Sequence, residues 1–398
     1  MTCEFRICSK AVNHIFRYET NKVSIIHDKC IGFILRFFQV LILVYVILYS
    51  IVYKRGYQDF YGLSSSVLVK VKGIGVSDRK DIHRKIWDIP DTVVPPQEMN
   101  AIFITTNAIE TANQSQGTCP EDTTVEDALC QKDSDCKKGK PLHLGNGVMT
   151  GRCVKSFRGT NKTCEIKAWC PIENDTIIFK KSALLKEVPD FTVLIRNTII
   201  FDTINVQRSN LFSWTRGIIN KKCIYNASDE LLKYCPIFKV STLIGNISKS
   251  ELNEMLTLGG VIRVIITWNC NLDYSADNCT PNYSFSRLYL NDGTFSKGWN
   301  FRYANYFEVD HVEHRMLYKV FGLRILIEVR GKAGKFSLVT LSMNIGSGLA
   351  LLSIAIFVCD ILIINCFSKK DKYQYKYEVH KKKKKDKSQM LKEKEEPV

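Results

Sequence analysis

The sequence lacks several patterns that mark enzymes and metal proteins. Its run Gly331-Lys332-Ala333-Gly334-Lys335 has neither the spacing nor the hydroxyl group of a Walker loop, so binding of a nucleotide would not imply hydrolysis. No Cys-x-x-Cys pair occurs, which disfavours zinc ligation, and the seven histidines are scattered along the chain. We therefore expect that the protein is not an enzyme and has no catalytic residue, metal or cofactor.

Long hydrophobic runs are equally scarce, and only two are long enough to cross a bilayer. We predict an N-terminal tail at 1–32, a first transmembrane helix at 33–53, an extracellular domain at 54–335, a second transmembrane helix at 336–366 and a Lys-rich tail at 367–398. An excess of basic residues in both tails predicts that both lie in the cytoplasm. The first 30 residues have no apolar core, so we expect the first span to be a signal anchor and not a cleaved leader. Because the lysine run at 381–385 follows a span, we expect a cytoplasmic segment and no nucleic-acid partner.

The second span mixes small and polar residues with apolar ones between Asn344 and Leu352. Asp360 is its one ionisable group between 339 and 364. This composition suits close helix packing or a wet lumen better than bulk lipid. The alternative is a membrane anchor whose glycines serve only helix packing.

Ten of the fifteen cysteines lie in the segment between the spans, and six of these fall in a cysteine-rich lobe at 119–170. Their even number, and the scarcity of apolar residues in the lobe, indicate disulfides in an oxidising compartment. All seven Asn-x-Ser/Thr sequons of the chain fall in the same segment. We predict glycosylation at Asn113, Asn161, Asn174, Asn226, Asn246 and Asn282.

Strand patterns dominate this segment, so we predict a mainly antiparallel, β-rich domain. The strands are expected at Ser66–Val71, Ala101–Ile109, Phe191–Ile195, Val261–Trp268 and Leu317–Val329. One helix is expected at Ser250–Leu258, because Ser248 and Glu251 have capping-box spacing and Gly259-Gly260 supplies a stop.

The segment between the spans is basic, and one strand concentrates part of that charge. The chain carries +16, of which about +8 remains on this segment after the tails are subtracted. Lys70 and Lys72 leave the same face of one strand, with Cα atoms about 6.6 Å apart. Neighbouring phosphates of a polyphosphate could be held there, although two exposed lysines on a solvated face are the commoner meaning.

Several motifs, taken in order, resemble those of the ionotropic purinergic receptors, the ATP-gated cation channels. They are Gly56-Tyr57-Gln58, Lys70-Val71-Lys72-Gly73, the ten-cysteine spacing, Asn300-Phe301-Arg302, Lys319-Val320-Phe321-Gly322-Leu323-Arg324, Gly331-Lys332-Ala333-Gly334-Lys335-Phe336 and Gly346-Ser347-Gly348. The likeness covers the chain from about Tyr18 to Asp360. It implies a non-selective cation channel of the plasma membrane, permeable to Na⁺, K⁺ and Ca²⁺ and opened by extracellular ATP that is not hydrolysed. It also implies a homotrimer, or a heterotrimer with related subunits, with a dolphin-like subunit and the second helices around the pore.

The resemblance implies specific residue roles. ATP would be bound between subunits by Lys70, Lys72, Phe191, Thr192 and Leu194 of one and Asn300, Arg302 and Lys319 of the next. The implied disulfides are Cys119–Cys170, Cys130–Cys153, Cys136–Cys164, Cys223–Cys235 and Cys270–Cys279. On the pore-lining second helix, three- and four-residue spacing puts Met343, Asn344, Ser347 and Ala350 on one face.

The chain departs from the family pattern near the expected pocket. The usual Asn before Phe-Thr is Asp190, which removes a glycan site and places an acid there. Alternatives that share the two-span, cysteine-rich plan are a proton- or peptide-gated sodium channel and a non-conducting glycosylated surface receptor. The sodium channel would not need the paired lysines or Asn300-Phe301-Arg302, and the receptor would show no ligand-evoked conductance.

Overall fold

The computed structural model describes residues 29–157, 159–176, 182–212, 223–288 and 298–366. The chain divides into two compact units, one formed by the two ends of the chain and the other by residues 60–335. Both tails are largely outside the described residues, so their cytoplasmic placement stays a prediction.

The first unit contains two helices that are long and apolar enough to cross a membrane. The first begins as α2 (Lys29–Val44) and continues as a π-helical segment, η1 (Tyr45–Tyr53); the second is α7 (Leu338–Cys366). The two helices pack closely because Gly348 has no side chain. A Cβ atom there would lie 2.8 Å from Cγ1 of Val46.

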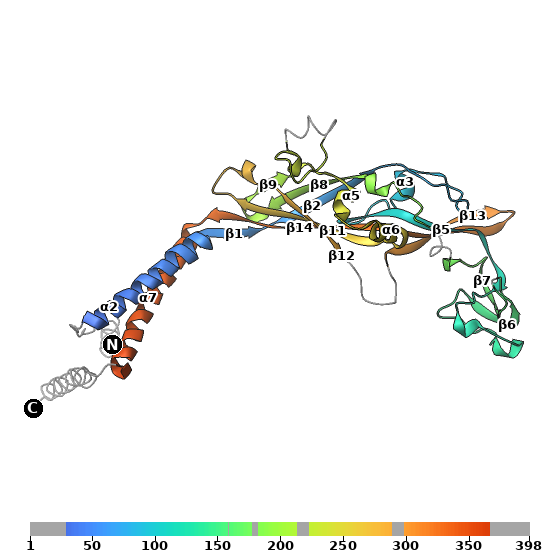
Figure 1. Ribbon diagram of the computed structural model, residues 1–398, viewed down its shortest axis with the longest axis horizontal. Helices are drawn as coiled ribbons and strands as arrows, with labels where there is room; N and C mark the ends of the chain where they lie inside the picture. The colour runs from blue at the N-terminus through green and yellow to red at the C-terminus, as the bar shows by residue number, and fades with distance from the viewer. Residues whose placement is uncertain (1–28, 158, 177–181, 213–222, 289–297, 367–398) are drawn as a thin grey trace, which may run out of the picture. The chain divides into compact units, whose positions relative to one another are not determined.

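The second unit is built on two main β-sheets (Figure 1). The larger sheet has the order β12-β11-β14-β5-β7-β6, and β1 and β13 also pair with β14. Its strands are β1 (Gln58–Gly62), β5 (Ala101–Pro120), β6 (Val148–Lys155), β7 (Lys162–Cys170), β11 (Gly260–Asn271), β12 (Asn282–Leu288), β13 (Asn300–Val309) and β14 (Val312–Phe336). The pairs β11–β12, β13–β14, β14–β5, β5–β7 and β6–β7 are antiparallel, whereas β11 and β14 are parallel.

The smaller sheet has the order β10-β8-β2, with β9 also on β8. Its strands are β2 (Ser64–Lys72), β8 (Thr192–Phe201), β9 (Val206–Ser209) and β10 (Ile237–Lys239). A two-stranded sheet joins β3 (Gly75–Val76) to β4 (Ile86–Trp87). The short helices are α3 (Ile89–Thr92), α5 (Val240–Ile244) and the 3₁₀ turns η2 (Glu126–Ala128), η3 (Asp133–Asp135), η5 (Val188–Asp190), η6 (Asp202–Ile204), η7 (Leu232–Tyr234) and η8 (Ala276–Asn278).

Residues of both sheets form one apolar core, because alternate residues of each strand point inward. On β8 the odd-numbered residues Val193, Ile195 and Ile199 are fully buried, whereas the even-numbered ones are partly or fully exposed. Trp268 of β11 is also fully buried, and its indole Nε1 donates to Oδ1 of Asn197 on β8 at 2.7 Å. The core therefore fixes which residues of β8 face outward.

The predicted helix is confirmed as α6 (Lys249–Leu258). The backbone N–H of Glu251 donates to Oγ of Ser248 at 3.2 Å, and the backbone N–H of Ser248 donates to Oε2 of Glu251 at 3.0 Å. Gly259 then adopts a φ of 86°, which ends the helix.

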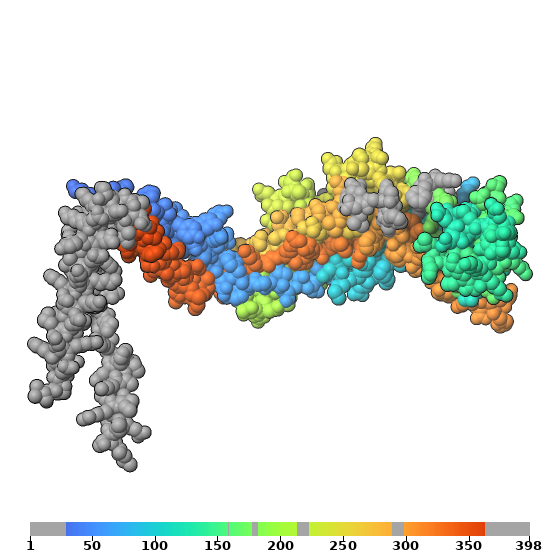
Figure 2. Space-filling view, turned by 90° about the horizontal axis from the view of Figure 1, so that it is seen from below, coloured from blue at the N-terminus to red at the C-terminus, as the bar shows by residue number. Residues whose placement is uncertain are grey.

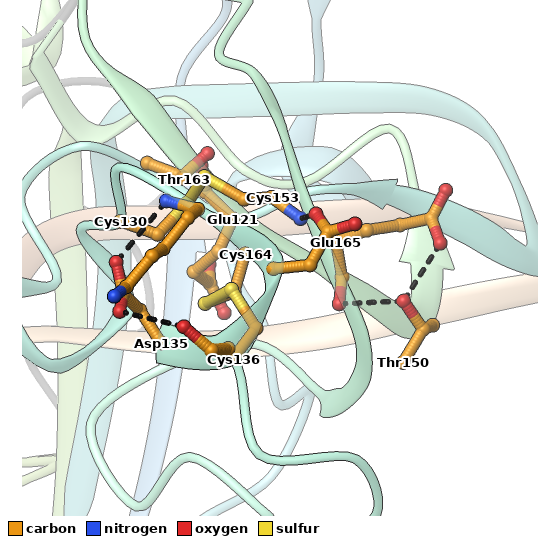
Figure 3. The surroundings of a disulfide bond; sticks show 12 residues. Glu121, Cys130, Asp135, Cys136, Thr150, Cys153, Thr163, Cys164 and Glu165 are labelled. Carbon is orange, nitrogen blue, oxygen red and sulfur yellow. Dashed lines mark hydrogen bonds between the residues drawn. A yellow bond between two sulfur atoms is a disulfide. The ribbon is translucent and has the colours of Figure 1, made fainter.

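The cysteine-rich lobe lies at one end of the second unit (Figures 1 and 2). Three disulfides cross it, and two more lie elsewhere in the unit; the five are Cys119–Cys170, Cys130–Cys153, Cys136–Cys164, Cys223–Cys235 and Cys270–Cys279, the pairing that the resemblance implies. Figure 3 shows two of these bonds close together, which explains why three cysteine sulfurs approach one another. Because every one of these cysteines is bonded to another, the zinc alternative is not favoured.

Candidate ligand-binding site

The first group of predicted site residues lies on the outer face of the smaller sheet. Lys70 pairs with Leu194 and Lys72 with Thr192 in the β2–β8 register, so the four side chains share one face. Both lysines are exposed, while Val71 between them is buried in the core. We call Lys70, Lys72, Thr192 and Leu194 the lysine half-site.

Phe191 does not belong to this face, which corrects the prediction that it contacts the ligand. Its side chain is 2% exposed and packs in the core. The ring also occupies the space beside Gly73, where a Cβ atom would lie only 2.3 Å from it. A glycine after Lys72 is therefore needed for packing. Phe191 packs on the core side of the sheet, opposite the face of the lysine half-site.

The second group lies on the β13–β14 ladder of the larger sheet. Arg302 pairs directly with Lys319, and Asn300 pairs with Phe321, so these residues share one face. The Lys319 ammonium group also lies 5.5 Å from the centre of the Phe321 ring. We call Asn300, Arg302 and Lys319 the arginine half-site.

Two acids that the sequence analysis missed hold these cations. The guanidinium Nε of Arg302 donates to Oε2 of Glu173 at 2.7 Å. The Lys319 Nζ lies 2.8 Å from Oδ1 of Asp175 and 3.6 Å from Oε1 of Glu173. Arg302, Glu173 and Asp175 line part of a cavity of about 500 Å³ that also borders Trp169. The acids come just after Cys170-Pro171, over 120 residues before Arg302, and no sequence pattern indicates that they meet it.

The two acids differ in how they hold protons. Burial raises the pKa of Glu173 above that of an ordinary carboxyl group, and its hydrogen bond with Asp175 acts in the same direction. Burial also acts to raise the pKa of Asp175, but hydrogen bonds with Glu173 and Lys319 outweigh it and keep that pKa below the usual range. Acidification therefore neutralises Glu173 before Asp175.

The two half-sites do not form one pocket within a subunit. They lie on different sheets, and Figure 1 shows β13 toward the end of the unit away from β2 and β8. On one subunit the two half-sites therefore lie apart, on different sheets.

Comparison with known proteins identifies the family. A family model described as the ATP P2X receptor matches residues 16–382. The chain belongs to this family. It is 41% identical over 370 residues to P2X purinoceptor 4 of Bos taurus, covering 92% of this chain and 94% of the relative. It is 39% identical over 373 residues to P2X purinoceptor 5 of Homo sapiens, covering 92% and 82%.

Solved P2X structures agree in fold. A P2X receptor from the Gulf Coast tick, in the presence of ATP and Zn²⁺, superposes with a TM-score of 0.74 at 39% identity, covering 83% of this chain and 99% of that one. The chicken ATP-gated P2X7 receptor channel with the competitive antagonist TNP-ATP gives 0.71 at 34%, covering 84% and 99%. The predicted family and the predicted fold, two apolar helices flanking a β-rich domain with five disulfides, are confirmed. P2X receptors are ligand-gated, trimeric membrane channels and not enzymes, as expected.

The predicted pore face of the second P2X helix is only partly compatible with the structure. Met343, Ser347 and Ala350 are exposed on the subunit, and their lining of a pore stays a prediction. The amide Nδ2 of Asn344, however, donates to the carbonyl of Gly56 at 2.6 Å. This contact turns the Asn344 side chain toward the end of the first helix, against the prediction that it lines the pore.

The predicted glycosylation sites are mostly accessible. Asn113, Asn161, Asn226, Asn246 and Asn282 are exposed, whereas Asn174 is half-buried. The Oδ1 atom of Asn174 accepts hydrogen bonds from the backbone N–H and the hydroxyl of Thr176, at 3.2 and 2.7 Å. Carbohydrate attachment at these positions stays a prediction.

Proposed function

We propose that this P2X chain forms a homotrimeric cation channel that extracellular ATP opens without being hydrolysed. The observation that carries the proposal is the separation of four cations into two half-sites on different sheets. Each half-site supplies two positive groups, and ATP carries close to four negative charges. The proton- or peptide-gated alternatives and the non-conducting receptor are not favoured, since neither accounts for both half-sites.

The arrangement suggests how binding is coupled to opening. Converging all four cations in one subunit would be costly because like charges repel at short range. When the cations are divided between two subunits, a bound ligand draws the two half-sites together. Binding therefore favours the conformation in which the half-sites are close. The strand β14 carries Lys319 and continues to Phe336, one residue before Ser337 and the start of α7 at Leu338. We propose that β14 transmits the approach of the two half-sites to the second helix.

The proposal extends to the membrane. The face formed by Met343, Ser347 and Ala350 has no carboxylate, so cations would be selected by polar groups and by acidic entrances more than by a charged ring. Na⁺, K⁺ and Ca²⁺ would all pass, and both chain termini would lie in the cytoplasm.

Whole-cell recording during a step of ATP tests this function. Cells that display the chain at their surface should give an inward current at negative potential, and substitution of each external cation in turn should give its permeability from the reversal potential. Lys70→Ala and Lys319→Ala should each weaken ATP potency by at least about tenfold, because a charge-assisted contact contributes about 1.5 to 3 kcal/mol. Surface trimers that conduct on acidification but not with ATP would contradict the proposal.

A further inference from the structure

The strand β5 has a bulge beside the arginine half-site. Asn107 pairs with Phe321 of β14, whereas the next pair along this ladder begins at Thr105, so Thr106 is an extra residue with no partner on β14. Phe321 also pairs with Asn300 of the arginine half-site. The residues Thr105, Thr106 and Asn107, which we call the β5 bulge, are fully buried.

A segment that continues from the lysine half-site contacts this bulge. Arg79, seven residues after Lys72, donates from Nη1 to Oδ1 of Asn107 at 2.6 Å and from Nη2 to the carbonyl of Ala108 at 3.3 Å. The Arg79 side chain is only 14% exposed and also pairs with Asp81 at 2.6 Å. The guanidinium group therefore holds the continuation of β2 against β5.

A second segment reaches the bulge just before β8. The backbone N–H of Leu185, seven residues before Thr192 of the lysine half-site, donates to the carbonyl of Thr106 at 2.9 Å. The Thr106 hydroxyl in turn donates to the carbonyl of Phe321 on β14 at 3.2 Å. Both Leu185 and Thr106 are fully buried, so a polar group left unpaired there would be costly. Both strands of the lysine half-site are thus connected, through the β5 bulge, to the ladder of the arginine half-site.

In a trimer each subunit takes part in two of the proposed ATP sites. Its lysine half-site belongs to the boundary with one neighbour, and its arginine half-site to the boundary with the other. We propose that the β5 bulge, through Arg79 and Thr106, couples the two ATP sites that share a subunit, so that binding at one raises the affinity of the other. Such coupling acts equally in both directions. Arg79 and Thr106 are positioning residues, and the inference rests on the proposed function, which places ATP between subunits.

The test uses three linked copies of the chain. Lys70→Ala and Lys72→Ala in the third copy disable one site and leave two ATP sites that share one subunit. Whichever direction the copies follow around the ring, the shared subunit is the first or the second copy. Thr106→Val, which removes the hydroxyl but keeps the shape, is placed in one copy at a time. Calorimetric titration of the purified trimers with ATP gives the two stepwise dissociation constants, and their statistically corrected ratio measures the coupling.

A second variant and two matched controls complete the design. Arg79→Gln tests the same coupling from the other segment, and it serves if Thr106→Val does not assemble. Thr163→Val is the control for the threonine, because the buried Thr163 hydroxyl donates to the carbonyl of Glu121 in the cysteine-rich lobe at 2.8 Å. Arg208→Gln is the control for the arginine, because the Arg208 side chain is 18% exposed and pairs with Asp277 at 2.8 Å.

We expect the second ATP to bind at least about fivefold more tightly than the first in the two-site parent trimer. Thr106→Val or Arg79→Gln in the shared copy should bring this ratio close to one. The same change in either of the other two copies, and both controls in any copy, should keep it. A parent ratio of one, or a ratio that both variants leave unchanged or lower equally in every copy, would overturn the inference while ATP still binds. Assembled trimers that bind no ATP would instead overturn the proposed function and, with it, this inference.

Discussion

Two acids, Glu173 and Asp175, neutralise the cations of the arginine half-site within the subunit. A phosphate group that binds Arg302 or Lys319 would compete with a carboxylate that already contacts it. Binding therefore exchanges one charge-assisted contact for another, and only the difference favours the ligand. If ATP binds here as proposed, the two acids would affect how much ATP is needed without contacting it.

Removing one acidic charge should make the channel more sensitive. We expect Glu173→Gln to raise ATP potency about fivefold, a modest effect because Arg302 is about half exposed and exposed ion pairs contribute about 1 kcal/mol or less. Concentration–response curves at matched surface expression measure it. Glu98→Gln is the control, since Glu98 contacts Arg324 of the same strand at 3.0 Å but lies outside both half-sites. Unchanged or lower potency in Glu173→Gln would argue against competition by this acid.

The raised pKa of Glu173 gives a pH dependence of known sign. The charged Glu173 carboxylate forms an ion pair with Arg302. When the pH falls through the raised pKa of Glu173, protonation weakens this ion pair. Ligand binding takes Arg302 away from Glu173 and so favours proton uptake by it; by linkage, acidification should favour binding through this group. The change in ATP potency as the pH is lowered from 7.4 toward the raised pKa of Glu173 should therefore differ between the parent chain and Glu173→Gln. Protonation of ATP itself affects both chains equally, so identical changes would exclude a role for Glu173.

Several site residues could be predicted from the sequence because strand geometry is local. The two-residue period of β2 placed Lys70 and Lys72 on one face, and the structure agrees. The same period, applied to β8, places Phe191 on the opposite face to Thr192 and would have excluded it from the site. Glu173 could not be predicted, since its contact with Arg302 depends on how a loop after the cysteine-rich lobe reaches a ladder 129 residues later.

Among the helices and strands, α6 could be predicted from the sequence and β13 could not, because only α6 has a clear local sequence signal. The Ser248–Glu251 cap is a rule between neighbours in the sequence, and the structure forms it. The strand β13 is exposed or only partly buried along its length, and Asn305 interrupts the alternation of apolar and polar residues that would reveal it. The parallel pairing of β11 with β14 likewise depends on long-range contacts that local patterns do not specify.

The proposal that the exposed face of α7 with Met343, Ser347 and Ala350 lines the pore can be tested with cysteine substitutions. Cysteine placed at Ser347 should be modified by a permeant, charged thiol reagent only while ATP is present, and the modification should block the current. Leu349→Cys, two residues along the same helix and therefore on a different face, is the matched control, and the parent chain controls for Cys30 and Cys359, which form no disulfide within the described residues. Equal modification at both positions would contradict the pore assignment.

In the whole molecule, the proposed ATP site is one that no single chain completes. One subunit offers the lysine half-site on the smaller sheet and the arginine half-site on the larger sheet. P2X receptors are trimers, and a closed ring lets each boundary bring the lysine half-site of one subunit to the arginine half-site of the next. Each trimer would then have three equivalent sites, all at boundaries.

Co-expression of two defective chains tests this claim most directly. A chain with Lys72→Ala and a chain with Arg302→Ala should each respond poorly to ATP alone, because every boundary in such a homotrimer lacks one cation. Mixed trimers contain boundaries with Lys72 from one chain and Arg302 from the other, so currents at ATP concentrations near those that open the parent channel should partly return. As a matched control, Lys70→Ala mixed with Lys72→Ala damages the same half-site in both chains and should restore nothing. A Lys72→Ala and Arg302→Ala mixture as insensitive to ATP as its parents, at matched surface expression, would contradict the site between subunits.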